Sequence, residues 1–88
     1  MYWKIIKDNI NKPPDKSEVG RFYKSVPVTG RLFKFRLLDD DRNVYFEGES
    51  NNCEDEVAFA PLDYFGLPGY GCTIIQYYNE DVKRWEDL

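Results

Sequence analysis

The sequence contains no histidine and no long apolar stretch. Without histidine, the chain cannot form a Ser-His-Asp or Cys-His catalytic arrangement, an imidazole metal site or a histidine-based pH switch. A membrane-spanning helix needs about 18 or more consecutive apolar residues, and no segment of the chain approaches that length. These absences exclude several common classes of hydrolase, metalloprotein and membrane protein.

Cysteine is also scarce, because Cys53 and Cys72 are the only two. Two thiols without histidine cannot complete the four ligands of a structural zinc site. Residues 1–8 show neither the apolar core nor the small-residue cleavage site of a signal peptide, which predicts a cytoplasmic protein. In that compartment we expect both cysteines to be free thiols, and we expect no metal and no cofactor.

Aromatic residues, by contrast, make up 17% of the 88 residues. These side chains favour pleated surfaces over helices, so the composition indicates a mostly β protein. A chain of this length forms one hydrophobic core, and we therefore expect residues 1–88 to be a single domain. Pro13 and Pro14 block regular structure within a polar segment, which predicts a mobile loop near residues 8–18.

Alternating apolar and polar residues predict a single antiparallel meander sheet of about five strands with one short helix. The central hairpin is expected at residues 31–49 and the last hairpin at residues 72–87. Residues 57–65 predict one or two helical turns at most, because Pro61 interrupts them. The glycine-rich residues that follow predict a tight connection to the next strand.

The pairing within the central hairpin follows from its apolar pattern. If Leu38 pairs with Asn43, Phe35 lies opposite Phe46 on the buried side of the sheet. The same register places residues of opposite charge across from one another on the exposed side, where each pair adds a few tenths of a kcal/mol. One register therefore suits both faces of the hairpin.

The last hairpin is expected to turn at residues 79–81, which are polar and acidic. The apolar pattern then pairs Tyr78 with Val82. This pairing places Ile75 opposite Trp85.

Charge is distributed unevenly along the chain. Residues 1–38 carry nine lysines and arginines and three acidic residues, whereas residues 39–88 carry three and thirteen. Pairs between strands cancel part of this asymmetry, but the acids in the predicted turns have few cations nearby. Exposed acids contribute little to folding, yet their field attracts cationic partners. The exposed acidic turns therefore predict a partner with a basic surface, and the alternative is that these acids only keep the domain soluble.

The leading interpretation is a small acidic interaction module without enzymatic activity, which binds a basic protein surface and neither nucleic acid directly nor a membrane. Its candidate residues are acids in predicted turns and two tyrosines of the Gly- and Pro-rich segment. They are Asp39, Asp40, Asp41, Glu54, Asp55, Glu56, Tyr64 and Tyr70. The tyrosines either form an exposed binding cluster or plug the end of the sheet, and a small domain's need for apolar side chains favours the plug.

Two other interpretations remain open. One is a small carboxylate-dependent hydrolase, and the other is a structural or accessory domain that binds no ligand. A closed pocket around two carboxyl groups, one of them with a raised pKa, would favour the hydrolase. An acidic face beside exposed aromatic side chains would favour the interaction module.

Two motifs resemble known ligand sites but lack their requirements. Asp39, Asp41 and Asn43 match the start of an EF-hand calcium loop, yet Val44 and Ser50 stand where that loop needs glycine and glutamate. The glycine-rich segment matches neither a P-loop nor a dinucleotide-binding motif. Both segments are therefore interpreted as turns.

Several segments are similar to a group of small uncharacterised bacterial proteins. They are FRLLDDD at residues 35–41, VYFEG at residues 44–48 and FAPLDYFG at residues 59–66, followed by GCT at residues 71–73. That group has no known activity, so the resemblance implies neither a function nor a site. Arg42 and Asn43 replace a glycine-containing turn of the group, which implies a longer loop here. Size and acidity also resemble phage-encoded inhibitors of bacterial defence systems, which implies an inhibitor or regulator.

Overall fold

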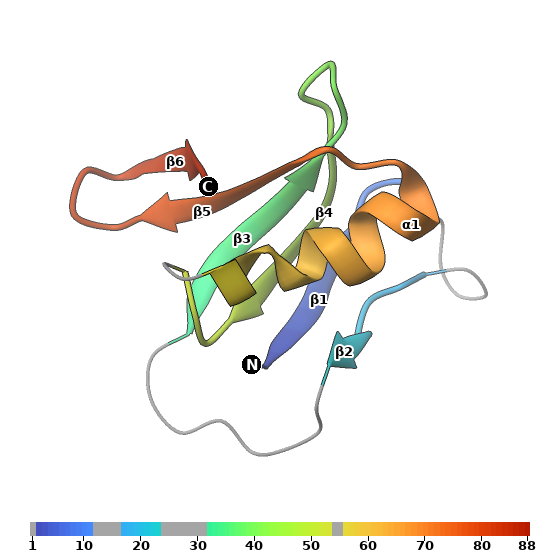
Figure 1. Cartoon of the computed structure of the whole chain (residues 1–88), viewed down its shortest axis with the longest axis horizontal. Coiled ribbons are helices and arrows are strands. Elements are labelled where there is room, and N and C mark those ends of the chain that lie inside the picture. The colour runs from blue at the N-terminus through green and yellow to red at the C-terminus, as the bar shows by residue number, and fades with distance from the viewer. Residues whose placement is uncertain (1, 12–16, 24–31, 54–55) are drawn as a thin grey trace.

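A helical segment crosses one face of a single antiparallel sheet (Figure 1). The computed structural model describes residues 2–11, 17–23, 32–53 and 56–88. The strands are β1 (Trp3–Asp8), β2 (Phe22–Tyr23), β3 (Phe33–Leu38), β4 (Val44–Ser50), β5 (Ile74–Asn79) and β6 (Arg84–Asp87). The predicted fold class, a single antiparallel sheet with a short helical part, is confirmed by five strands of four or more residues. The strand order differs from the predicted meander, because β4 and β5 follow each other in the chain but are not neighbours in the sheet.

The strands lie across the sheet in the order β2, β1, β4, β3, β5, β6. Two sequence-adjacent hairpins, β3–β4 and β5–β6, are joined by the pairing of β3 with β5, and β1 lies beside β4. Alternate side chains enter the core under the helix, so Trp3 and Ile5 of β1 are buried while Lys4 between them is exposed. The predicted core residues Phe35 and Phe46 are also fully buried.

The predicted register of the central hairpin is wrong. Leu38 pairs with Val44 and not with Asn43, and a β-bulge follows directly, so that Phe35 lies opposite Gly48 and not opposite another phenylalanine. A Cβ atom on residue 48 would overlap the Phe35 ring. Glycine at this position therefore makes room for a large core side chain on the neighbouring strand.

The loop between β3 and β4 explains the shifted register. The Asp39 carboxylate accepts hydrogen bonds from the backbone N–H groups of Asp41 and Asn43, at 2.9 and 2.8 Å. Arg42 has a positive φ of 65°. These contacts are typical of a side-chain-capped loop that is longer than the turn that strand alternation alone predicts.

The register of the last hairpin also differs from the prediction. Tyr78 pairs with Trp85 instead of Val82, and Trp85 therefore does not lie opposite Ile75. The side-chain oxygen of Asn79 accepts hydrogen bonds from the backbone N–H groups of Asp81 and Val82, at 3.0 and 3.4 Å. As in the first hairpin, a side-chain oxygen stabilises a longer loop than the apolar pattern indicates.

The helical segment is longer than the one or two turns predicted. It consists of the 3-10 helix η1 (Glu56–Phe59), the π-helix η2 (Leu62–Gly66) and the short α-helix α1 (Leu67–Tyr70). Pro61 has helical angles, φ −59° and ψ −35°, because proline fits the first turns of a helix where no N–H partner is needed. The wide π turn precedes Pro68, and Gly71, with φ of 71°, ends the segment.

The mobile loop predicted near residues 8–18 includes residues 12–16, which lie outside the described part of the chain. On either side of them, Asp8, Asn11 and Glu18 take part in hydrogen bonds. The flanks of this loop are therefore attached to the domain.

Candidate functional site

The three aspartates of the β3–β4 loop differ in what they offer a partner. The Asp39 carboxylate is occupied by its own loop, and the hydrogen bond from the Asn43 side chain is the main reason that the pKa of Asp39 is lowered. Asp40 accepts a hydrogen bond from the Thr73 hydroxyl, whereas Asp41 is exposed. Two of these predicted binding residues thus stabilise local structure.

The other predicted acids do not join this loop in one patch. Glu56 is exposed at the start of η1, and Glu54 and Asp55 lie outside the described residues. Figure 1 shows β4 running from this loop toward the start of the helix. A strand of seven residues spans about 20 Å, so the two acidic regions lie at opposite ends of β4. The described acids among the predicted residues therefore occupy separate regions of the surface.

The two predicted tyrosines have different environments. Tyr64 is 73% exposed on the helix. Tyr70 is half-buried, with its ring centroid 4.7 Å from that of Phe46 and 5.5 Å from that of Phe65. Tyr70 is therefore placed as the plug that the sequence favoured, and Tyr64 is the one of the pair that offers a large exposed ring.

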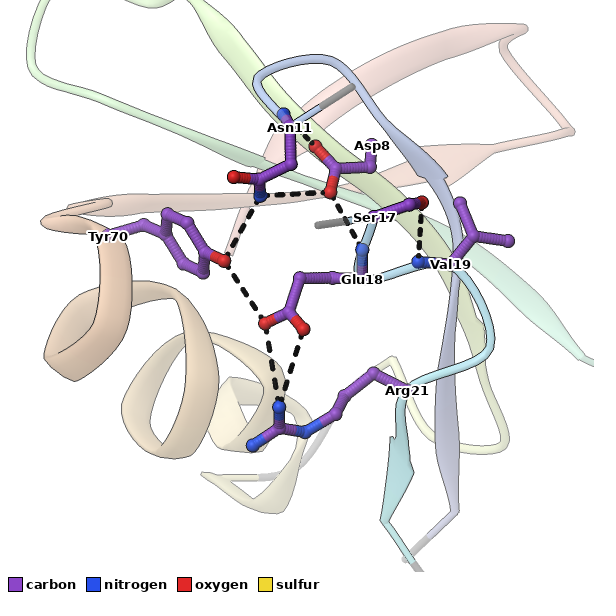
Figure 2. Close-up of polar contacts among 7 residues, drawn as sticks. All are labelled: Asp8, Asn11, Ser17, Glu18, Val19, Arg21 and Tyr70. Carbon is purple, nitrogen blue, oxygen red and sulfur yellow. Dashed lines mark hydrogen bonds and ion pairs between the residues drawn. The ribbon is translucent and has the colours of Figure 1, made fainter. Parts of the chain in front are cut away.

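Polar side chains attach the residues after β1 to the end of the helix (Figure 2). The Tyr70 hydroxyl donates a hydrogen bond to Glu18 and accepts one from the Asn11 amide, both at 3.1 Å. Glu18 also forms an ion pair with Arg21 at 3.4 Å. Asp8 accepts hydrogen bonds from the backbone N–H groups of Asn11 and Glu18, both at 2.8 Å. These contacts thus connect Asn11 and Glu18 both to Asp8 at the end of β1 and to Tyr70 at the end of the helix.

The carboxyl pKa values bear on the hydrolase alternative. Burial raises the pKa of Asp8, but the hydrogen bonds led by those from Asn11 and Glu18 outweigh it and leave the pKa below its usual value. The pKa values of Asp39 and Asp87 are lowered as well. A general acid at neutral pH needs a raised pKa. In the described part of the chain, the carboxyl groups with a clear shift therefore favour the ionised state, which does not favour the hydrolase.

A shallow depression of about 310 Å³ lies beside the β5–β6 hairpin. Its lining residues are Phe33, Cys53, Tyr77, Tyr78, Asn79, Glu80, Asp81, Glu86, Asp87 and Leu88. Four of them are acidic, three are aromatic, and none is lysine or arginine. The Tyr77 hydroxyl donates to the Ala58 carbonyl oxygen at 2.8 Å, and burial raises its pKa to about 12. Tyr77 therefore contributes a fixed, neutral ring.

The four carboxylates of the depression are only partly compensated. Asp87 pairs with Arg42 at 2.8 Å and accepts a hydrogen bond from Gln76, and these two contacts lower its pKa. Glu86 accepts a hydrogen bond from the uncharged Asn79 side chain at 3.0 Å. Glu80 and Asp81 lie in the exposed loop of the hairpin, which also contains Lys83. No lysine or arginine is among the described residues that line the depression itself, and four carboxylates in such a lining favour a negative potential.

The sequence contains a signal for part of this depression. Glu80 and Asp81 are recognisable as acids of a predicted turn, but no local pattern brings them near Phe33 and Cys53. That proximity depends on the pairing of β3 with β5 and on the last hairpin's actual register. The local sequence pattern therefore does not predict the depression, which forms only through the pairing of strands that are distant in the sequence.

Comparison of the chain with family models, with curated proteins and with solved structures gives no match. Among the described residues, no helix is long and apolar enough to span a membrane. The geometry and chemistry of the depression are therefore the evidence for a binding function.

Proposed function

We propose that this protein is a non-enzymatic interaction module that binds a basic segment of a macromolecular partner at the β5–β6 depression. The observation that carries the proposal is the composition of the lining, in which four carboxylates and three aromatic residues surround a concave surface without a lysine or arginine. This site replaces the separate acidic loops as the preferred binding region.

The lining suits a lysine or arginine side chain in several ways. Carboxylates form charge-assisted hydrogen bonds with ammonium and guanidinium groups. Aromatic rings attract the same cations through their π faces. A volume of about 310 Å³ holds one or two long side chains but encloses no large ligand. Because the contacts are between opposite charges, binding is expected to be fast and sensitive to salt.

A simpler account is that these acids only keep the protein soluble. In that case, removing charge anywhere on the surface would weaken binding of a polycation to the same extent. A specific depression instead predicts that position matters, because charge-assisted contacts require the lining residues themselves.

The experiment is a calorimetric titration with a capped oligoarginine peptide at low and physiological ionic strength. The variant E80Q/D81N removes two charges from the depression, and E56Q/D63N removes two exposed charges from the helix as a matched control. We expect the first variant to bind at least about fivefold more weakly and the control to bind like the wild type. Equal losses in both variants, or no binding to the wild type at low salt, would contradict the proposal.

A further inference from the structure

Strand β6 ends the strand order of the described sheet, and the hairpin that contains it extends beyond the helix (Figure 1). The Leu88 N–H donates to the Ile75 carbonyl oxygen at 3.0 Å. Hydrogen-bonded pairs recur at every second residue of an antiparallel ladder. The N–H and C=O groups of Trp85 and Asp87 therefore point away from β5, toward the outer edge.

The charges along this edge have a self-complementary order. Lys83 and Arg84 precede Trp85, and Glu86 and Asp87 follow it. The four charged residues are exposed. When a second copy of β6 runs in the opposite direction, Arg84 of each copy aligns with Glu86 of the other.

We propose that β6 pairs with β6 of a second copy of this chain, antiparallel and about a twofold axis at Trp85. The outward N–H and C=O groups of Trp85 then bond to those of Trp85 in the other copy. Arg84 lies opposite Glu86 on both sides of the axis, whereas Lys83, with a φ of 54°, precedes β6 and takes no part in the pairing. The Arg84–Glu86 pairs fall at positions between hydrogen-bonded pairs, where opposing side chains approach most closely.

The charge order also selects this register from its neighbours. An axis at Glu86 would place that carboxylate opposite its own copy, and an axis at Asp87 would do the same for Asp87. Like charges directly opposite each other destabilise a strand pair. Only the axis at Trp85 brings opposite charges together at both flanking positions. This register is therefore favoured by its own charge pairs, and the neighbouring registers are disfavoured by like charges.

The edge is also held in one conformation before pairing. The Arg36 guanidinium lies 4.4 Å from the Trp85 ring centroid, and the Tyr78 ring lies 5.3 Å from it. Asp87 is fixed by the ion pair with Arg42. A strand that is already ordered loses little conformational entropy on association. Since the edge is only four residues long, we expect a weak, salt-sensitive dimer.

The test is sedimentation equilibrium on the full chain at low salt, at concentrations up to about 1 mM. The variants R84E and E86R each place like charges across the axis, and both are expected to associate at least about tenfold more weakly than the wild type. Their equimolar mixture restores opposite charges at every position. It is therefore expected to form a heterodimer with at least wild-type affinity.

Because R84E or E86R could fail to dimerise simply by unfolding, a second variant tests the strand pairing without a change of side chain. Ligation at Gly71–Cys72 allows an N-methyl group to be placed on Trp85, which removes its outward N–H and changes no side chain. This variant is expected to keep the wild-type circular dichroism spectrum and to lose dimerisation. The proposal is overturned if the wild type stays monomeric, if the N-methyl variant dimerises normally, or if folded R84E and E86R do not associate when mixed.

Discussion

Asp8 and Asp39 accept hydrogen bonds from several backbone N–H groups of the loops in which they lie. Asp8 accepts three such bonds and Asp39 accepts two. In both cases the carboxylate replaces the missing partners of a chain that is changing direction. An acid in a turn is therefore an ambiguous signal, because the same residue type serves local structure and partner binding.

The Asp8 carboxylate leads to a prediction about pH. Burial raises its pKa, but its hydrogen bonds outweigh this and leave the folded-state pKa below the unfolded value of about 3.9. Such a group stabilises the protein fully above the unfolded pKa, and this contribution is lost as the pH falls through the folded pKa. Asp8→Asn should lower the free energy of unfolding at neutral pH and flatten its decline in acid. Urea unfolding at a series of pH values measures both, and parallel curves for the two proteins would contradict the assignment.

The two cysteines should differ sharply in reactivity. Cys72 is fully buried, and burial raises its pKa to about 11, whereas Cys53 is only half-buried. Because the thiolate is the reactive form, a thiol reagent near pH 8 should modify Cys53 in the folded protein and Cys72 only after denaturation. Mass spectrometry of the labelled peptides gives the order of modification. Equally fast labelling of Cys72 would show that it is not enclosed as described.

The strands themselves can be predicted from the sequence, but their registers cannot. Alternation identifies Phe35 and Phe46 as core residues, because each strand has one buried face. The pairing of these strands depends on the loop that Asp39 caps and on the space that Gly48 leaves. Neither effect is visible in an apolar pattern, so a register chosen from that pattern is displaced even though Phe35 and Phe46 are correctly identified as buried.

Gly48 provides a direct test of the observed register. A Cβ atom at this position would overlap the Phe35 ring and the Lys4 carbonyl oxygen, so Gly48→Ala should destabilise the protein by about 1–3 kcal/mol. Lys34→Ala, an exposed change on the adjacent strand, should cost under about 1 kcal/mol. Chemical denaturation of both variants gives the comparison. A neutral Gly48→Ala would show that the Phe35 ring does not lie against residue 48.

The helical segment shows a different limit of prediction. Pro61 suggests an early end, yet the helix continues because proline is compatible with a first turn and a wide π turn precedes the next proline. Gly71, by contrast, ends the helix as its conformational freedom predicts. Gly66 and Gly69, which the sequence pattern predicts in a tight connection after the helix, lie within the helical segment instead, so only the glycine with a positive φ marks its end.

In the whole molecule, the uneven charge of the sequence is partly resolved by the order of the strands. Acidic β4 lies between β1 and β3, which carry the lysines and arginines. Lys7 of β1 forms an ion pair with Glu47 at 3.6 Å, and Arg36 of β3 lies opposite Glu47 in the β3–β4 register. The β5–β6 hairpin has no such basic neighbour strand beyond it among the described residues. Asp87 is instead compensated by its ion pair with Arg42.

Binding of basic segments at the β5–β6 depression can be located by titrating isotope-labelled protein with oligoarginine and following the amide chemical shifts. If the depression is the binding site, the largest changes fall on residues 79–88 and on Phe33 and Cys53, and they diminish as salt is added. Largest changes on the loop at residues 39–41, or small changes spread evenly over all exposed acids, would contradict it.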